Sequence, residues 1–159
     1  MIFAVIGTSS WNFDRLIKEL DEIAPDIDES IVMQIGNSDY IPKNSEFFRF
    51  KPKNEVENIY KNADTIICHA GIGSILSSVK YNKNIILVPR RRKYGELLDD
   101  HQIEIARKLE QIGIPVVWNI KELKSTLLQI REKKLNIGEE RIRFIKSLSE
   151  FLSDMTILD

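Results

Sequence analysis

The chain contains 159 residues, of which 43% are apolar and 30% are charged, and its formal net charge is -1; these values are typical of one globular domain in solution. The near-zero net charge excludes binding to nucleic acid through bulk electrostatic attraction, and no apolar run reaches the roughly 18 residues that a membrane-spanning helix needs. The single cysteine, Cys68, excludes an internal disulfide and is expected to be a buried, reduced thiol in a cytoplasmic protein.

The first part of the chain alternates between apolar runs and amphipathic segments. Residues 1–6 form an uninterrupted apolar run that ends at Gly7, which is typical of a strand buried on both faces. Apolar side chains then recur at helical spacing from Phe13 to Ile23. The same criteria predict a strand over 30–35, a loop over 37–45, a short strand over 47–50 and a helix over 54–62.

The alternation continues to the C-terminus. The predicted elements are strands over 65–68, 85–88 and 116–118, and helices over 73–81, 97–109, 121–131 and 139–152. Strands that alternate with helices predict an α/β fold, here one domain over 1–159, with a mostly parallel sheet and helices on both faces. The last helix, within 139–154, is a candidate for docking on a partner through Phe144, Ile145, Leu148, Phe151 and Leu152, although core burial explains these positions equally well.

Glycine-bearing turns follow three of the predicted strands. They are GTSS at 7–10, Gly36, and HAGIGS at 69–74. In open parallel sheets, ligands bind outside the carboxyl ends of the strands. We therefore expect the three turns to meet at one crevice.

The HAGIGS turn leads directly from a strand into a helix. Glycines there let backbone N–H groups approach a ligand, and the helix N-terminus carries about half a positive charge. The pattern favours phosphate as the ligand, with the hydroxyl of Ser74 as a further donor. The alternative is a tight turn that needs glycine only for a positive φ. For GTSS the alternative is a helix N-cap.

Two further segments would reach the same edge of the sheet. Asp99 or Asp100 can cap the helix that begins near DDHQ, and His101 and Gln102 would then contact phosphate or sugar hydroxyls, unless this is only a solvated first turn. The basic run 90–93 is interpreted as a flexible cationic loop that screens a diphosphate or contacts anionic lipid, or as a solvated charge run.

Other classes of site lack a signal. Two histidines and one cysteine without paired spacing give no metal site. The chain also lacks a Walker motif and a GxSxG elbow, which argues against ATP hydrolysis and against a serine nucleophile.

Three stretches together resemble the donor-binding half of the GT-B glycosyltransferases, the family 28 C-terminal domain: FAVIGTSSWNFDRLIKELD, YKNADTIICHAGIGSILSSVKYNKNIILVPRR and LLDDHQIEIARKLEQIGIPVV. The likeness covers about residues 1–120 and is greatest to the small subunits of split UDP-sugar transferases. These are the cytosolic subunit of the dolichol-linked GlcNAc transferase and the bacterial exopolysaccharide transferase subunits. The resemblance implies a Rossmann-like GT-B half.

The resemblance also implies which positions contact a UDP-sugar donor. They are Gly7, Thr8 and Ser9 in the first phosphate-side loop, Phe50 and Lys51 at the uracil through backbone atoms, His69, Ala70, Gly71, Gly73 and Ser74 along the diphosphate, and Asp100, His101 and Gln102 at the sugar. Relatives often hold the ribose with an acidic residue just beyond the glycine turn, where this chain has Ser77. The base of the nucleotide is therefore left open.

By the same resemblance, we expect a hexosyltransferase that works without metal or cofactor. It would move a hexose or N-acetylhexosamine from a UDP-sugar to a polyprenyl-diphosphate-linked acceptor. The general base would belong to a membrane-associated partner subunit, because 159 residues leave no room for the other half of such an enzyme. The chain would then be cytoplasmic and peripheral to the membrane through that partner. The alternatives are a non-enzymatic nucleotide-sugar binding module and, less in keeping with the length, a stand-alone hydrolase or epimerase.

Overall fold

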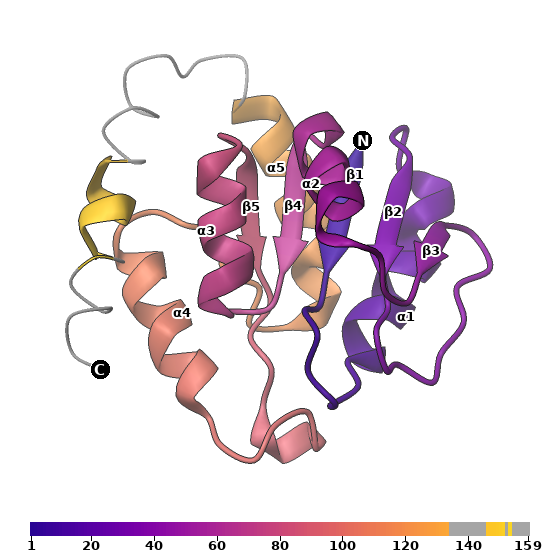
Figure 1. Ribbon diagram of the computed structural model, residues 1–159, viewed down its shortest axis with the longest axis horizontal. Coiled ribbons are helices and arrows are strands. Elements are labelled where there is room, and N and C mark those ends of the chain that lie inside the picture. Colours follow the sequence, from indigo (N-terminus) through magenta and orange to yellow (C-terminus); the bar gives the residue numbers. More distant parts are fainter. Residues whose placement is uncertain (134–145, 152, 154–159) are drawn as a thin grey trace.

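The computed structural model describes residues 1–133, 146–151 and 153 (Figure 1). In this part of the chain, one sheet contains β1 (Ile2–Val5), β2 (Ile31–Gln34), β3 (Glu46–Phe48), β4 (Thr65–Cys68) and β5 (Asn84–Leu87). The strand order is β3-β2-β1-β4-β5 and every pairing is parallel. The order reverses direction at β1, where ligands bind in folds of this kind.

The central strands are buried on both faces, as their continuous apolar sequences predict. In β1, Val5 pairs with Gln34 of β2 on one side and with Cys68 of β4 on the other. The carboxyl ends of these strands therefore lie at one edge of the sheet, at the bottom of Figure 1. The loops that follow them leave from the same edge.

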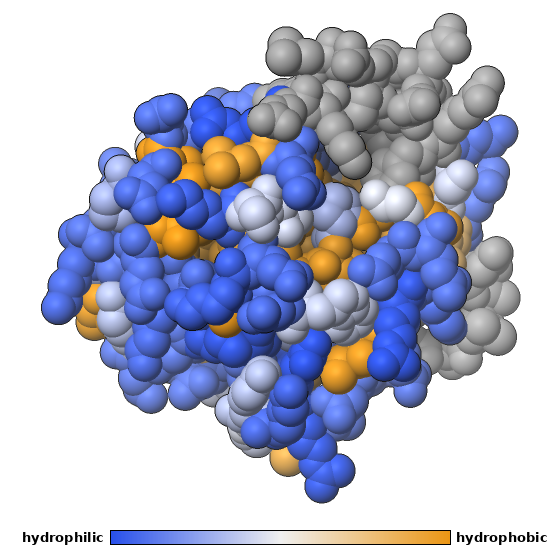
Figure 2. Space-filling model, turned by 180° about the vertical axis from the view of Figure 1, so that it is seen from behind, coloured by the Kyte–Doolittle hydropathy of each residue, from blue (hydrophilic) through white to orange (hydrophobic). Residues whose placement is uncertain are grey.

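Helices cover both faces of the sheet. On one face, α1 (Asp14–Ile23) and α5 (Leu123–Lys133) pack against the side chains of Ile2, Ala4 and Ile6. On the other face, α2 (Lys53–Asn62), α3 (Ile72–Lys80) and α4 (His101–Gln111) pack against Phe3 and Val5. Alternate residues of β1 thus enter opposite cores, and the predicted α/β fold with helices on both faces is confirmed. The face behind that of Figure 1 is largely hydrophilic, with separate hydrophobic patches (Figure 2).

Two predicted elements differ from those found. The strand expected over 116–118 is a single bridge, in which Val116 pairs with Leu87 of β5. The helix expected from residue 97 begins only at His101, because residues 92–94 form a 3₁₀ turn that ends at Gly95 with φ of 69°. Two further 3₁₀ turns, at Ala24–Asp26 and Ile120–Glu122, border α1 and α5.

The C-terminal helix expected within 139–154 lies partly outside the described residues, as do Phe144, Ile145 and Leu152. Residues 146–151 are helical. Leu148 is fully buried in the core between the sheet and α4, and Phe151 packs against the same core. Core burial therefore explains these two positions. None of the helices described is both long and apolar enough to span a bilayer.

Candidate functional site

Three strand ends meet in one place, as the glycine-bearing turns predict. The imidazole of His69, at the end of β4, lies against Gly7, at the end of β1: a Cβ added to Gly7 would be 2.8 Å from Cε1 of His69. Gly36, after β2, lies on the other side, where its Cβ would be 3.5 Å from the carbonyl oxygen of Gly7. The corners after β2, β1 and β4 are thus contiguous.

The first glycine of HAGIGS makes room for a side chain of the protein itself. A Cβ on Gly71 would collide with Nε2 of His69, so the imidazole fills the space between Gly7 and Gly71. Gly71 has φ of -91°, so it is not required for a positive φ. Gly7, with φ of 77°, is required both for its conformation and for its closeness to His69. These two glycines therefore make room for the imidazole of His69 and do not leave an open space for a ligand between them.

The second glycine of HAGIGS is open to ligand. Gly73 is the second residue of α3 and is exposed. Apart from its chain neighbours and the backbone of α3 itself, no heavy atom of the described residues lies within 4 Å of the position of an added Cβ. The N-cap of α3, Gly71, carries no capping side chain. The first backbone N–H groups of a helix have no intrahelical partner. The N-terminus of α3 therefore presents backbone donors and a partial positive charge beside the corner of β1.

His69 is neutral at physiological pH. Burial, together with the positive charge of Arg90, lowers the pKa of His69 to about 4, and the backbone of Val5 offsets this only in part. Its Nδ1 is buried, and it has no hydrogen-bond partner within the described residues. A buried polar atom without a partner is costly, and its occurrence is a frequent sign of a site completed by water or ligand.

Two of the three serines of α3, Ser74 and Ser77, lie near a buried tyrosine of α2. The hydroxyls of Ser74 and Ser77 lie near the phenol of Tyr60, and this contact partly offsets the rise in the pKa of Tyr60 that its burial causes. Ser77 also donates to the carbonyl of Gly73 at 3.0 Å. Ser77 therefore makes its contacts within the protein. A serine hydroxyl at this position does not supply the negative charge of the acidic residue that was expected at the ribose.

The loop after β1 is held by its neighbours. The hydroxyl of Ser9 accepts from the backbone N–H of Trp11 at 3.2 Å, and its carbonyl accepts from the amide of Asn37 at 3.0 Å. Thr8 is exposed at the tip. Thr8 and Ser9 therefore follow directly after Gly7, which lies against His69, and Ser9 is tied to the corner of β2 through Asn37.

Arg90 is not part of a flexible cationic loop, contrary to the interpretation of the basic run. Its side chain is fully buried. Nη2 donates to the carbonyl of Ile6 at 2.9 Å, and Nη1 donates to the carbonyls of Trp11 at 2.9 Å and of Asn12 and Glu96 at 3.4 Å. Burial lowers the pKa of Arg90 to about 10, so it remains charged at pH 7. This arginine is a structural cation beneath the site.

Glu96 completes the buried network. Its carboxylate accepts from Nε and Nη2 of Arg15 at 2.8 and 2.9 Å, and from the backbone N–H of Arg91 at 2.9 Å. Arg15 also donates to the carbonyl of Pro89. Glu96 and Arg15 were not among the predicted site residues, because no sequence pattern joins a residue of α1 to a residue of a loop 81 positions later.

The loop after β5, which contains Arg90 and Glu96, leads into the start of α4. Oε1 of Gln102 accepts from the backbone N–H of Arg90 at 3.1 Å, which leaves its amide nitrogen without a partner within the described residues. Asp100 accepts from the backbone N–H of Arg92 at 3.0 Å, and Asp99 accepts from that of His101. His101 itself is exposed. The structure therefore places Gln102 at the site edge and gives Asp100 the role of holding the loop.

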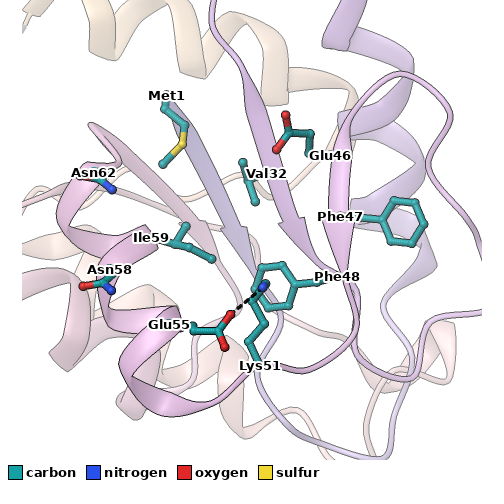
Figure 3. A pocket seen from close by; sticks show the side chains of 10 residues that line it. All are labelled: Met1, Val32, Glu46, Phe47, Phe48, Lys51, Glu55, Asn58, Ile59 and Asn62. Atoms are coloured by element: carbon teal, nitrogen blue, oxygen red, sulfur yellow. Dashed lines mark hydrogen bonds and ion pairs between the residues drawn. The ribbon is translucent and has the colours of Figure 1, made fainter.

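The segment after β3 lies further along the sheet edge. Arg49 donates to the carbonyls of Gly36 and Ser38 at 2.8 and 2.9 Å, which ties the segment to the corner of β2. Phe50 is half exposed next to it. Lys51 instead forms an ion pair with Glu55 at 2.7 Å and lines a groove of about 400 Å³ between β3 and α2 (Figure 3).

Of the predicted site residues, the structure brings together Gly7, Thr8, Ser9, His69, Ala70, Gly71, Gly73 and Ser74 at the carboxyl ends of β1 and β4. Gln102 lies at the border of this group, through its contact with the backbone of Arg90. Asp100 and His101 border this group, and Phe50 and Lys51 lie beyond Gly36. Among the described residues, no three histidine, cysteine or acidic side chains are grouped so that they could hold a metal ion.

Comparison with known proteins gives one family. The model of the glycosyltransferase family 28 C-terminal domain matches residues 1–154. A UDP-N-acetylglucosamine transferase subunit, ALG13 of Candida albicans, is 32% identical over 112 residues, which are 70% of this chain and 35% of that protein. The chain thus spans about a third of the length of this relative.

Solved structures share the fold at lower identity. MurG of Acinetobacter baumannii has a TM-score of 0.60 and 18% identity, over 95% of this chain and 49% of that chain. The solution structure of ALG13 has a TM-score of 0.55 and 20% identity, over 85% of both chains. At these identities the likeness concerns the fold, and it agrees with the Rossmann-like arrangement described above.

Proposed function

Because the chain belongs to the glycosyltransferase family 28 C-terminal domain family, we propose that it is the donor-binding subunit of a two-component hexosyltransferase. The donor is a UDP-sugar that carries a hexose or N-acetylhexosamine. The acceptor is a sugar linked to polyprenyl diphosphate, held by a membrane-associated partner subunit. The name of the relative, a UDP-N-acetylglucosamine transferase subunit, supports both the donor class and the division into subunits.

One observation carries the proposal: the open N-terminus of α3 at Gly73, directly beside the contiguous corners of β1 and β4. A diphosphate along this edge would accept from the backbone N–H groups of the helix and would lie at its positive end. The neutral His69 and the exposed Thr8 border the same space. No fixed anionic side chain of these corners opposes the charge of the diphosphate.

The proposed transfer reaction depends on stabilising the negative charge that develops on the leaving UDP. When the glycosidic bond to the donor breaks, negative charge grows on the departing UDP, and preorganised N–H donors stabilise it in the transition state. This role needs no metal ion. The attacking hydroxyl of the acceptor must lose its proton to a general base, and we assign that base to the partner subunit. Gln102, whose amide nitrogen has no hydrogen-bond partner within the described residues, would contact the sugar.

Calorimetric and thermal-shift titrations test the donor class. The chain is titrated with UDP, UDP-GlcNAc, UDP-Gal, UDP-Glc and GDP-Man, and we expect UDP and at least one UDP-sugar to bind and to raise the melting temperature. GDP-Man is the control for the base. Absence of binding by every nucleotide at millimolar concentration would refute the donor-binding role.

Reconstitution tests the two-component arrangement. A membrane fraction that contains the partner subunit and a polyprenyl-linked acceptor is combined with the chain, and transfer of radiolabelled sugar is measured. We expect transfer only from the mixture. Binding of UDP-sugar without transfer from the mixture would favour the alternative, a non-enzymatic nucleotide-sugar module, for which Ser77 in place of an acidic ribose ligand is the motivating feature. Hydrolysis of the donor by the chain alone would favour a hydrolase.

A further inference from the structure

We propose that Arg90 is a positioning residue for the donor site, which clasps both ends of the loop 7–10 and so fixes the phosphate-side corner of β1. This inference rests on the proposed function for its ligand. Arg90 would touch neither the nucleotide nor the sugar. Its action would pass entirely through backbone carbonyls that flank the loop.

The geometry of the clasp is specific to a guanidinium group. The carbonyl of Ile6 precedes the loop and accepts from Nη2, and the carbonyl of Trp11 follows the loop and accepts from Nη1, each at 2.9 Å. The two terminal nitrogens of one planar group therefore close the base of a four-residue loop. A lysine has one nitrogen on a flexible stem and cannot reproduce both contacts in the same plane.

The same side chain joins the loop to other parts of the site. Nη1 lies 3.4 Å from the carbonyl of Glu96, and the backbone N–H of Arg90 donates to Gln102 at the start of α4. The guanidinium carbon lies 5.0 Å from the ring centroid of Phe13, which precedes α1. Arg90 thus makes contacts from the loop after β5 to the loop after β1, to α4 and to the start of α1.

Burial explains why these contacts bind the loop firmly. Arg90 is fully buried, and its Nε has no partner within the described residues. A buried charge is tolerated only where polar groups compensate it. The carbonyls at the two ends of the loop supply that compensation, so loss of the loop conformation would leave the cation unsolvated. The loop and the arginine consequently hold each other in place.

Two variants test the clasp. Arg90→Met removes the charge and both contacts, and Arg90→Lys keeps the charge and loses the paired geometry. Arg107→Met, at an exposed position of α4, is the matched control for loss of one positive charge. Leu127→Ala, on the buried side of α5, is the control for loss of stability without a change at Arg90. All four are studied well below their melting temperatures.

The first measurement needs no ligand. Hydrogen–deuterium exchange of the backbone amides of residues 7–12 should be faster in both Arg90 variants than in the wild type and in the two controls. The second measurement is the dissociation constant of UDP, which should rise on the order of tenfold or more in both Arg90 variants, because small displacements of positioning groups have large effects. The controls should keep the wild-type affinity.

The outcomes separate the two proposals. Unchanged exchange in Arg90→Met overturns the clasp, whether or not UDP binds. Wild-type exchange and affinity in Arg90→Lys also overturn it, because charge alone would then suffice. If Arg90→Met does not fold, Arg90→Lys decides the question alone. Failure of the wild type to bind UDP, with faster exchange in the variants, refutes the donor-binding role and leaves the clasp standing.

Discussion

Gly73 is the residue at which the structure and the proposed chemistry meet most directly. Gly73→Asp places a carboxylate at the open N-terminus of α3, where there is space for the side chain. Folding stability should stay the same or rise by up to about 1 kcal/mol, because glycine is unfavourable in a helix and an acidic group suits the helix N-terminus. UDP should no longer raise the melting temperature, because the carboxylate occupies the place of the anion.

Gly73→Asn is the matched control, since it has nearly the same shape without the charge. Thermal-shift titration with UDP is expected to show partial retention of binding in the asparagine variant. An unchanged response of Gly73→Asp would contradict the anion site. Equal loss in both variants would show that bulk, and not charge, is responsible.

His69 should make the protein sensitive to acid. Its pKa is lowered to about 4 in the folded chain, whereas a histidine in the unfolded chain titrates near 6.5. Between these values the unfolded state binds the extra proton, so the free energy of unfolding falls as the pH falls from about 6.5 to about 4. The full contribution is at most about 3 kcal/mol.

Urea denaturation of the wild type and of His69→Asn, from pH 7.5 to pH 4, measures this contribution. The difference between the two profiles should appear below pH 6.5 and grow toward pH 4, with the asparagine variant less sensitive. Carboxylates that titrate in the same range cancel in the difference. Parallel profiles would show that the burial of His69 does not cost the expected free energy.

At the scale of elements, Glu96 links helix α1 to the loop after β5. Arg15 contacts both oxygens of Glu96, and the glutamate is almost fully buried. Glu96→Ala should lower the free energy of unfolding by about 3 kcal/mol, because it leaves the charge of Arg15 without its anionic partner in a partly buried place. The pair between Glu22 and Lys121 is exposed, so Glu22→Ala should have little effect.

Chemical denaturation of Glu96→Ala, Arg15→Met and the double variant gives the coupling free energy of the pair. We expect the double variant to lose less than the sum of the single variants. Additive losses, or a loss in Glu96→Ala no larger than in Glu22→Ala, would contradict the buried link.

Elements with a strong local pattern could be predicted from the sequence. The continuous apolar run of β1 and the helical spacing of α1 specify their own structure, and both were placed within a residue or two. The start of α4 was placed four residues early, because Leu97 and Leu98 continue the apolar spacing while Gly95 and the 3₁₀ turn before it delay the helix. The bridge at Val116 consists of a single residue pair with Leu87, which is too short to produce a recognisable strand pattern in the sequence.

The role of the glycines could be predicted only in part. Glycine at positions 71 and 73 indicated a close approach to the backbone, which the structure shows at Gly71 and not at Gly73 among the described residues. The sequence could not show that the approaching group at Gly71 is the imidazole of His69, since this depends on the rotamer of a buried side chain. The burial of Arg90 could not be predicted either, because its partners are backbone carbonyls, which every sequence provides.

For the whole molecule, alternation of strands and helices predicted the layers but not the order of the strands. A continuous apolar sequence indicates that a strand is central, but it does not indicate which strands lie beside it. β1 pairs with both β2 and β4 because the crossover connections run on opposite sides of it. Chain order did place the three glycine-bearing turns at one edge. The location of the candidate site could therefore be predicted from the order of strands and helices. The buried network of Arg90, Glu96 and Arg15 beneath it could not.

The lone thiol of Cys68 gives the molecule an internal reporter of its own opening. It lies on β4 within the core and burial raises its pKa to about 12, so a thiol reagent at neutral pH can label it only in molecules that have transiently opened. Labelling kinetics should therefore be slow in buffer and accelerate with denaturant. A nucleotide that binds only the closed form should slow labelling by the factor one plus its concentration over its dissociation constant. Rapid labelling without denaturant, or a rate indifferent to a bound nucleotide, would mean that β4 opens apart from the rest of the fold.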